Sequence, residues 1–248
     1  MLSKNRIKWL RGLQLKKNRT AEGVFVAEGP KLVGELLAAG FECVYLAATE
    51  VQDSWRIETE IVTEDELRRV SSVETPQGVL AVLRQPHYDV KLSEVASQRL
   101  CLLLDGVQNP GNLGTIVRLA DWFGIGDVFC IGGCADLYNP KTVQATMGAL
   151  AHVRVHYNIG VEDLEGGDFP VYGTFLDGEN LYGKRLENRG VIVMGNEGRG
   201  ISPEVERRVT DRLWIPSYSD CHVESLNVAI ATAVVCAEFR RRSLPSLT

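Results

Sequence analysis

The feature of this 248-residue chain that most constrains its fold is a regular alternation of strands and helices from residue 100 onward. The alternation opens with the run LCLLLD, which is typical of a strand buried on both faces. Later strands are predicted at 128–131, 153–156, 171–175, 191–194 and 213–215, and helices at 113–123, 141–150, 203–209 and 225–240. Such alternation predicts an α/β fold with a mainly parallel sheet that helices cover on both sides.

The first ninety residues form a smaller α/β pattern of their own. Ile7, Leu10 and Leu13 recur at helical spacing and indicate a basic amphipathic helix. Further helices are predicted from Pro30 to Gly40 and over 64–70, and strands over 24–27, 43–47 and 79–83. Apolar periodicity then fades. The sequence therefore predicts a first domain over 1–88, a linker over 89–99 and a second domain over 100–248.

Composition and cysteine placement exclude several classes of protein. No apolar run approaches the roughly 20 residues of a membrane helix, and no signal peptide is recognisable, which predicts a cytoplasmic protein without a membrane partner. The six cysteines include no C-x-x-C pair, so we expect free thiols rather than a disulfide framework or a zinc site. His152 and His156 lie in a segment that alternates like a strand, and no metal site is predicted.

The distribution of charge is more informative than the net charge of −5. Residues 1–19 contain seven basic residues and no acidic one: Lys4, Arg6, Lys8, Arg11, Lys16, Lys17 and Arg19. Such a cluster favours contact with phosphate, and Lys16, Lys17 and Arg19 are the predicted contacts. The arginines at 240–242 fit a solvated face equally well.

Three polar loops each follow a strand of the second domain. They are DGVQNPGNLGTIVRLA (105–120), VIVMGNEGRGIS (191–202) and LWIPSYSDCHVESLNVA (213–229). In open α/β sheets, ligands bind beyond the carboxyl ends of the strands, where such loops converge. The sequence therefore predicts that the three loops build one site.

Each loop also has a purely structural interpretation. The first contains a turn that leads into a helix, and Arg118 would be an exposed residue of that helix. The glycines of GNEGRG permit a tight turn, and their order is not that of a dinucleotide-binding motif. Ser225 would serve as the N-cap of the last helix, with Asn227 in its first turn. No Ser-His-Asp set can be assembled.

In order and spacing, the three loops resemble the three motifs of SpoU-class RNA 2′-O-ribose methyltransferases, the TrmH-like members of the SPOUT superfamily. The resemblance runs through residues 101–242 and includes NPKTVQATMGAL (139–150). The segments EGVFVAEGPKLVGELL (22–37) and ETPQGVLAVL (74–83) resemble the small ribosomal-protein-like RNA-binding domain that many members carry. Nearly the whole chain is covered.

This resemblance implies a deep trefoil knot in the second domain, an obligate homodimer and S-adenosylmethionine bound in the knot. It implies donor contacts, largely through backbone groups, at Gly195, Ile215 and Leu226, with Thr174, Asn196 and Gly200 alongside. The implied catalytic residues are Asn112, Arg118, Glu197, Ser225 and Asn227. Between Ile215-Pro216 and Ser225 the chain has SYSDCHVE, which is longer than the family pattern and borders the donor site.

The chemistry of methyl transfer suits these residue types. A sulfonium is already an activated electrophile, so the protein must mainly align a ribose 2′-hydroxyl with the methyl group. Arg118 is the proposed base in this class, although an arginine pKa above ~12 makes that role difficult. The alternative is that Arg118 holds a phosphate while another group or water takes the proton. Glu197 would orient the arginine or the ribose.

The sequence thus predicts S-adenosylmethionine-dependent 2′-O-methylation of a ribose in RNA. Ribosomal RNA is preferred over transfer RNA, because an added RNA-binding domain suits a large structured target. The other hypothesis is a non-catalytic RNA-binding or ribosome-binding protein on the same fold. The complete set of motif residues favours the enzyme.

Overall fold

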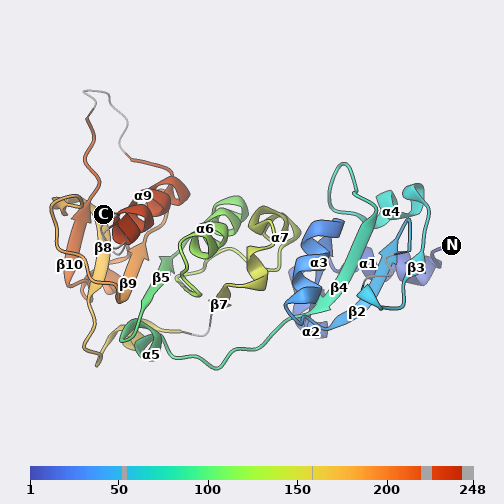
Figure 1. Ribbon diagram of the computed structural model, residues 1–248, viewed down its shortest axis with the longest axis horizontal. Helices are drawn as coiled ribbons and strands as arrows, with labels where there is room; N and C mark the ends of the chain where they lie inside the picture. The colour runs from blue at the N-terminus through green and yellow to red at the C-terminus, as the bar shows by residue number, and fades with distance from the viewer. Residues whose placement is uncertain (52–54, 158, 219–224, 242–248) are drawn as a thin grey trace, which may run out of the picture. The chain divides into compact units, whose positions relative to one another are not determined.

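The computed structural model describes residues 1–51, 55–157, 159–218 and 225–241. The chain divides into two compact units (Figure 1). The first comprises Met1–His87 together with Asp136–His152, and the second comprises Tyr88–Ala135 together with Val153–Thr248. Residues 136–152, which the sequence groups with the second domain, therefore pack with the first unit.

The first unit is a four-stranded sheet with helices around it. Its strands are β1 (Val24–Glu28), β2 (Cys43–Ala48), β3 (Glu60–Ile61) and β4 (Val79–Arg84), and its helices are α1 (Lys4–Gly12), α2 (Lys16–Glu22), α3 (Pro30–Ala38), α4 (Glu64–Val70) and α7 (Pro140–Thr146). The sheet order is β1-β4-β2-β3, antiparallel except for the β2–β3 pair. Ile7, Leu10 and Leu13 join its core, which confirms the predicted amphipathic helix.

Residues 136–152 complete this first unit. The ring of Tyr138 lies 4.9 Å from the ring of Phe25 on β1, and α7 packs against the same strand. The predicted helix over 141–150 is wrong in its second half, because Met147 has a left-handed backbone with φ 52° that ends α7 at Thr146. A short 3-10 helix, Ala149–Ala151, follows.

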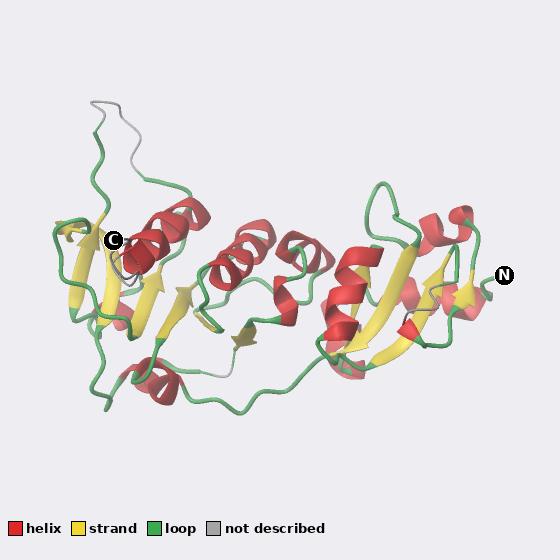
Figure 2. Cartoon of the chain, in the orientation of Figure 1, coloured by secondary structure: helices red, strands yellow, loops and turns green. Residues whose placement is uncertain are grey.

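The second unit contains a six-stranded sheet (Figure 2). Its strands are β5 (Leu100–Asp105), β6 (Asp127–Ile131), β7 (Arg154–His156), β8 (Val171–Asn180), β9 (Gly190–Met194) and β10 (Asp211–Trp214), in the order β10-β8-β9-β5-β6-β7. Every pair is parallel, which confirms the predicted parallel sheet. Its helices are α5 (Leu92–Ala96), α6 (Pro110–Trp122), α8 (Pro203–Glu206) and α9 (Val228–Arg241), and a 3-10 helix spans Val161–Leu164.

Several predicted boundaries need correction. The segment predicted as a linker contains α5, whose Leu92 and Val95 pack against Cys101 and Leu103 of β5. Helix α6 starts at Pro110 rather than 113, because the Asn109 side chain caps it. The last strand lies at 211–214 instead of 213–215, α8 ends at residue 206 instead of 209, and α9 starts at 228 instead of 225.

Two predictions from composition can be compared with the described residues. The thiols of Cys43, Cys101, Cys130, Cys134 and Cys236 are free, as predicted, whereas Cys221 lies outside the described residues. No helix in the described part of the chain is long and apolar enough to cross a membrane.

Candidate functional site

The three polar loops leave the sheet at one edge, because the carboxyl ends of parallel strands lie on the same side. The first follows β5, the second follows β9 beside it, and the third follows β10. Strand β8 lies between β9 and β10, so the three strands are not consecutive neighbours. Thr174 lies on this intervening strand, and its Oγ1 donates to the carbonyl of Val193 at 3.3 Å.

The first loop turns directly into α6. Asn109 Oδ1 accepts hydrogen bonds from the backbone N–H groups of Gly111 and Asn112, and Pro110 occupies the first helical turn, where its missing N–H costs nothing. Two turns further on, Arg118 lies on the exposed side of the helix, and it forms no ion pair with any described residue. The cap thus fixes the start and the direction of the helix that carries Arg118.

The second loop, Gly195–Gly200, is held closed from within. Asn196 and Gly200 exchange two backbone hydrogen bonds of 2.9 Å, and Asn196 Oδ1 accepts from the N–H groups of Gly198 and Arg199. A side chain at Gly195 would collide with Gly200, since an added Cβ would lie 2.3 Å from its carbonyl carbon. Asn196 therefore builds the loop, and both its backbone groups and its side chain are already engaged.

Residues at the end of β5 form hydrogen bonds with both ends of this second loop. Asp105 Oδ2 accepts from the N–H of Ser202 at 2.6 Å, and the carbonyl of Gly106 accepts from Asn196 Nδ2 at 2.7 Å. Asp105 is only 5% exposed. This role of Asp105 was not predicted from the sequence, although a carboxylate that ends an otherwise apolar strand is a usable signal.

The three loops meet in a chain of side-chain hydrogen bonds. Asn112 Nδ2 donates to Glu197 Oε1 at 2.7 Å, and Asn227 Nδ2 donates to Asn112 Oδ1 at 3.1 Å. Asn227 Oδ1 accepts from the N–H groups of Ala229 and Ile230, so Asn227 rather than Ser225 is the N-cap of α9. The structure thus brings together three of the five predicted catalytic residues. The other two, Arg118 and Ser225, are exposed. Arg118 follows Asn112 by six positions, and Ser225 precedes Asn227 by two.

The residues predicted to hold the methyl donor belong to the second and third loops and to β8. Ile215 directly follows β10 and is half-buried, and Leu226, next to Asn227, is 49% exposed. Leu176, two residues after Thr174 on β8, is 74% exposed. Apolar side chains with exposed surface and a loop of glycine backbone are residue types that suit the adenosyl part of S-adenosylmethionine, so the residues present fit this donor. Residues 219–224 of the long third loop, including His222, lie outside the described residues.

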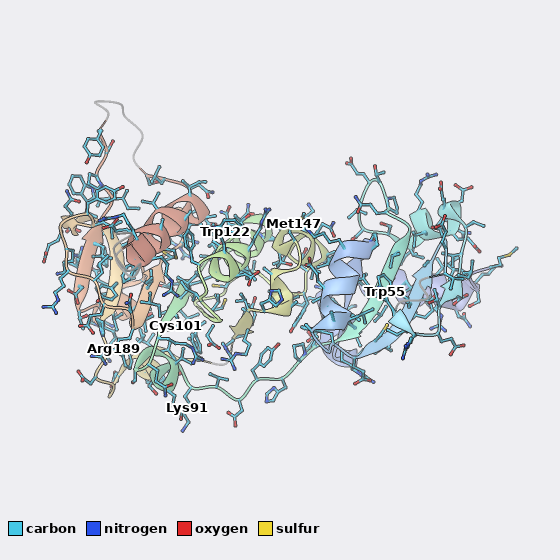
Figure 3. All side chains as sticks on the ribbon, in the orientation of Figure 1. Trp55, Lys91, Cys101, Trp122, Met147 and Arg189 are labelled. Carbon is cyan, nitrogen blue, oxygen red and sulfur yellow. The ribbon has the colours of Figure 1, made fainter. Side chains whose placement is uncertain are left out.

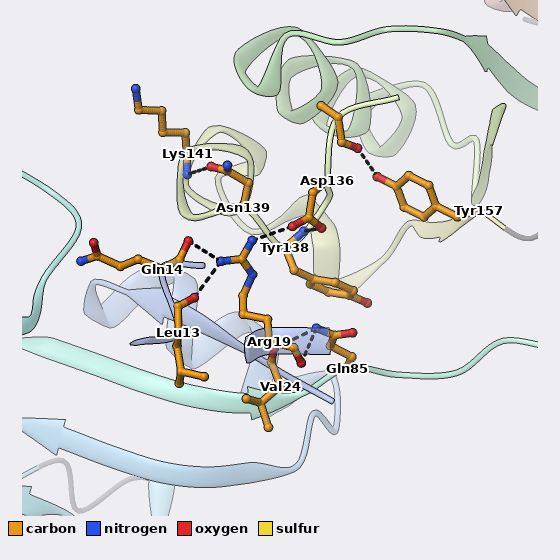
Figure 4. A network of polar contacts seen from close by, with 11 residues as sticks. Leu13, Gln14, Arg19, Val24, Gln85, Asp136, Tyr138, Asn139, Lys141 and Tyr157 are labelled. Carbon is orange, nitrogen blue, oxygen red and sulfur yellow. Dashed lines mark hydrogen bonds and ion pairs between the residues drawn. The ribbon is translucent and has the colours of Figure 1, made fainter. Parts of the chain in front are cut away.

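The predicted phosphate contacts in the first unit divide into two kinds. Lys16 and Lys17 are exposed on α2 and form no ion pair within the described ranges. Arg19 is only 2% exposed, and its guanidinium donates to the carbonyls of Leu13 and Gln14 and to Asp136 Oδ2 (Figure 4). The prediction that Arg19 contacts nucleic acid is therefore wrong, because the side chain is buried and both terminal nitrogens of its guanidinium donate within the fold.

A second charged cluster lies at the other end of the sheet, where β6 begins. The enclosed carboxylate of Asp127 accepts hydrogen bonds from Arg99, Arg154 and His156 at 3.0, 2.8 and 2.9 Å. Burial raises the pKa of Asp127, but the hydrogen bonds from His156, Arg154 and Arg99 outweigh burial and hold that pKa well below its usual range. This cluster joins the starts of neighbouring strands and is far along the strands from the three loops.

Comparisons with known proteins agree with this geometry. A profile of the SpoU rRNA methylase family matches residues 99–237, and a profile of the MRM3-like substrate binding domain matches residues 4–81. The chain is 34% identical to the Bacillus subtilis 23S rRNA (guanosine(2553)-2′-O)-methyltransferase RlmP over 95% of this chain and 96% of that protein. We conclude that the chain belongs to the SpoU rRNA methylase family.

Solved structures show the same architecture over almost the whole length. A Porphyromonas gingivalis protein assigned to the TrmH family is 46% identical, with a TM-score of 0.86 over 98% of this chain and 99% of that one. An AdoMet-bound rRNA methyltransferase from Sinorhizobium meliloti is 28% identical, with a TM-score of 0.88 over 99% of this chain and 97% of that one. The SPOUT α/β fold and the small additional N-terminal domain are thereby confirmed.

Proposed function

We propose that this protein transfers a methyl group from S-adenosylmethionine to a ribose 2′-oxygen of ribosomal RNA. The observation that carries the proposal is the hydrogen-bonded set Asn112, Glu197 and Asn227, which joins all three motif loops. Arg118 is exposed on the helix that starts from the first of these loops. The full-length relative named as a 23S rRNA methyltransferase supports ribosomal RNA over transfer RNA.

We assign donor binding to the glycine loop and its neighbours. Gly195, Gly200, Ile215 and Leu226 would hold S-adenosylmethionine, with Thr174 and Asn196 fixing the backbone around it. The bound donor supplies an activated methyl group on a positively charged sulfur. The apolar side chains would exclude water from this region, which strengthens every electrostatic interaction made there.

We assign the RNA side of the reaction to Arg118, Asn112, Glu197, Ser225 and Asn227. A guanidinium remains charged at every working pH, so Arg118 would bind the substrate phosphate and stabilise the negative charge that develops on the 2′-oxygen. Asn112 would keep the Glu197 carboxylate in one orientation toward the ribose. The Asn227 amide is shared between Asn112 and the α9 cap, which leaves it little freedom to move.

We further propose that residues 1–88 form the RNA-binding domain, 89–99 the connection and 100–248 the methyltransferase domain. The substrate-binding profile over residues 4–81 supports the first assignment. Lys16 and Lys17 would contact RNA, because both are exposed and neither pairs with an acidic residue in the described part of the chain. We also propose the trefoil knot in the second domain and a cytoplasmic location, where ribosomal RNA is found.

We propose that two copies of the chain pair through α6 and α9, which lie side by side in the second unit (Figure 1). Trp122 on α6, which Figure 3 labels, is 83% exposed. One face of α9 carries a row of at least partly exposed apolar residues, namely Ile230, Ala233, Val234 and Ala237. Monomeric proteins rarely leave such a contiguous apolar surface in water, whereas homodimer interfaces are rich in it.

The proposed function is tested by methylation of unmodified 23S rRNA transcript with isotope-labelled S-adenosylmethionine. We expect label in one 2′-O-methylnucleoside, identified by mass spectrometry after complete digestion. The Arg118→Ala variant provides the matched negative control. Label on a base, label only on transfer RNA, or no transfer by the wild-type protein would each contradict the proposal.

A further inference from the structure

The tip of the second loop presents two charged side chains with different surroundings. Glu197 is held by Asn112 at 2.7 Å, whereas Arg199, two residues on, is exposed and forms no ion pair with any described residue. Arg199 is not among the motif residues to which a role is assigned above. Its guanidinium is therefore a strong hydrogen-bond donor that forms no ion pair within the described part of the chain.

The backbone beneath Arg199 is unusually well fixed for a glycine-rich loop. The N–H of Arg199 donates to Asn196 Oδ1 at 3.0 Å, and the Asn196 side chain is itself bound to the carbonyl of Gly106. The next residue, Gly200, donates its N–H back to the carbonyl of Asn196. Arg199 thus projects from a base that is tied to β5, and it does not have to be ordered by a ligand.

Some arginines of the second unit are paired with acidic residues. Arg212 pairs with Asp177 and Glu206, and Arg189 pairs with Glu187. Arg118 and Arg199 differ from these, since neither has an acidic partner within the described residues and both lie on loops or helices that the Asn112–Glu197 contact joins. The helix and the loop that this contact joins therefore each carry one arginine without an acidic partner among the described residues.

We propose that Arg199 is a second phosphate-binding residue of this site, which contacts the RNA backbone beside the target nucleotide. This inference rests on the proposed function. A planar guanidinium binds a phosphodiester through two parallel hydrogen bonds, which fixes orientation as well as adding affinity. With Arg118 at the reacting sugar, a second anchor in the rigid loop would hold the strand at two points and so increase the affinity for RNA.

The test compares Arg199→Ala with the wild-type enzyme on 23S rRNA transcript. We expect the KM for RNA and the RNA Kd from filter binding to rise about 10-fold, as for loss of one charge-assisted contact. The dependence of log Kd on log salt should become shallower by about 0.7 if the contacted RNA is single-stranded. The kcat at saturating RNA and the calorimetric Kd for S-adenosylmethionine should stay near wild type, and Arg199→Lys should recover part of the RNA affinity.

Arg207→Ala is the matched control. Arg207 is also exposed and forms no ion pair with a described residue, but it lies beyond the end of α8 and outside the loop. The RNA affinity of the Arg207→Ala variant should match that of the wild type.

Weakened donor binding with unchanged RNA affinity in Arg199→Ala would overturn the inference, because the guanidinium would then bind the carboxylate of the donor. Equal effects of both variants, or none, would also overturn it. Filter binding reports on Arg199 even if the wild type methylates no RNA, so failure of the proposed function is distinguishable.

Discussion

The side-chain amide of Asn112 donates to Glu197 Oε1 over 2.7 Å, so one hydrogen bond connects the first turn of α6 to the loop after β9. Replacing Asn112 by Ala should lower kcat about 10-fold to 100-fold, since a hydrogen bond to a charged group contributes about 1.5–3 kcal/mol. Single-turnover kinetics would measure the effect. The Kd for S-adenosylmethionine should change little, and an equally large loss of donor affinity would show that Asn112 supports the donor instead.

Arg118→Ala should abolish methyl transfer while it leaves donor binding nearly intact. The side chain is exposed and makes no ion pair with a described residue, so its removal should not perturb the fold. Calorimetry of donor binding and a methylation time course would separate the two effects. Turnover that survives in this variant would remove the role assigned to Arg118.

The basic residues of α2 should divide into two classes of behaviour. Lys16→Ala and Lys17→Ala should weaken RNA binding and each reduce the salt slope by about 0.7 on single-stranded RNA, with unfolding unchanged. Arg19→Ala should instead lower the free energy of unfolding by about 3 kcal/mol or more, because it leaves the Asp136 carboxylate without its guanidinium. Urea denaturation and filter binding on all three variants would test this division. A stable Arg19→Ala protein with weakened RNA binding would reverse it.

Asp127 should make stability depend on pH in the acid range. Its pKa is lowered in the folded chain, so its stabilising effect is fully present above the unfolded value of about 3.9 and is lost as the pH falls toward the folded value. Asp127→Asn should cost about 3 kcal/mol at neutral pH, and its difference from the wild type should shrink below about pH 4. Thermal unfolding at a series of pH values would show this, and a constant difference down to pH 2 would contradict it.

The proposed pairing of two copies can be tested on α9. Ile230→Glu adds a charge at an exposed position, so a monomeric protein would tolerate it with little loss of stability. If α9 pairs with a second copy, the variant should sediment as a monomer at micromolar concentration while the wild type sediments as a dimer. Ile61→Glu, at another exposed position in the first unit, is the control and should leave the wild-type mass unchanged.

Local patterns predicted most of the helices and strands, because alternating and helical periodicities reflect burial directly. Helix α5 was not predicted, because it is only five residues long and its apolar residues cover a single turn. The strand-end rule and the family resemblance correctly anticipated that Asn112, Glu197 and Asn227 would lie together. The burial of Arg19 could not be predicted, because it depends on Asp136, a residue 117 positions away. Asp105 was overlooked because its role depends on Ser202, which only the folded chain brings near.

The inclusion of residues 136–152 in the first unit affects how the protein can be dissected or recombined. A fragment that stops at residue 88 would lack Asp136 and Tyr138, so Arg19 and Phe25 would lose a partner that the fragment cannot supply. A chimera of the substrate-binding domain of one relative and the methylase domain of another would have the same mismatch, unless residues 136–152 are taken from the same relative as the substrate-binding domain. Natural substitutions in α2 and in this segment should therefore occur in compensating pairs.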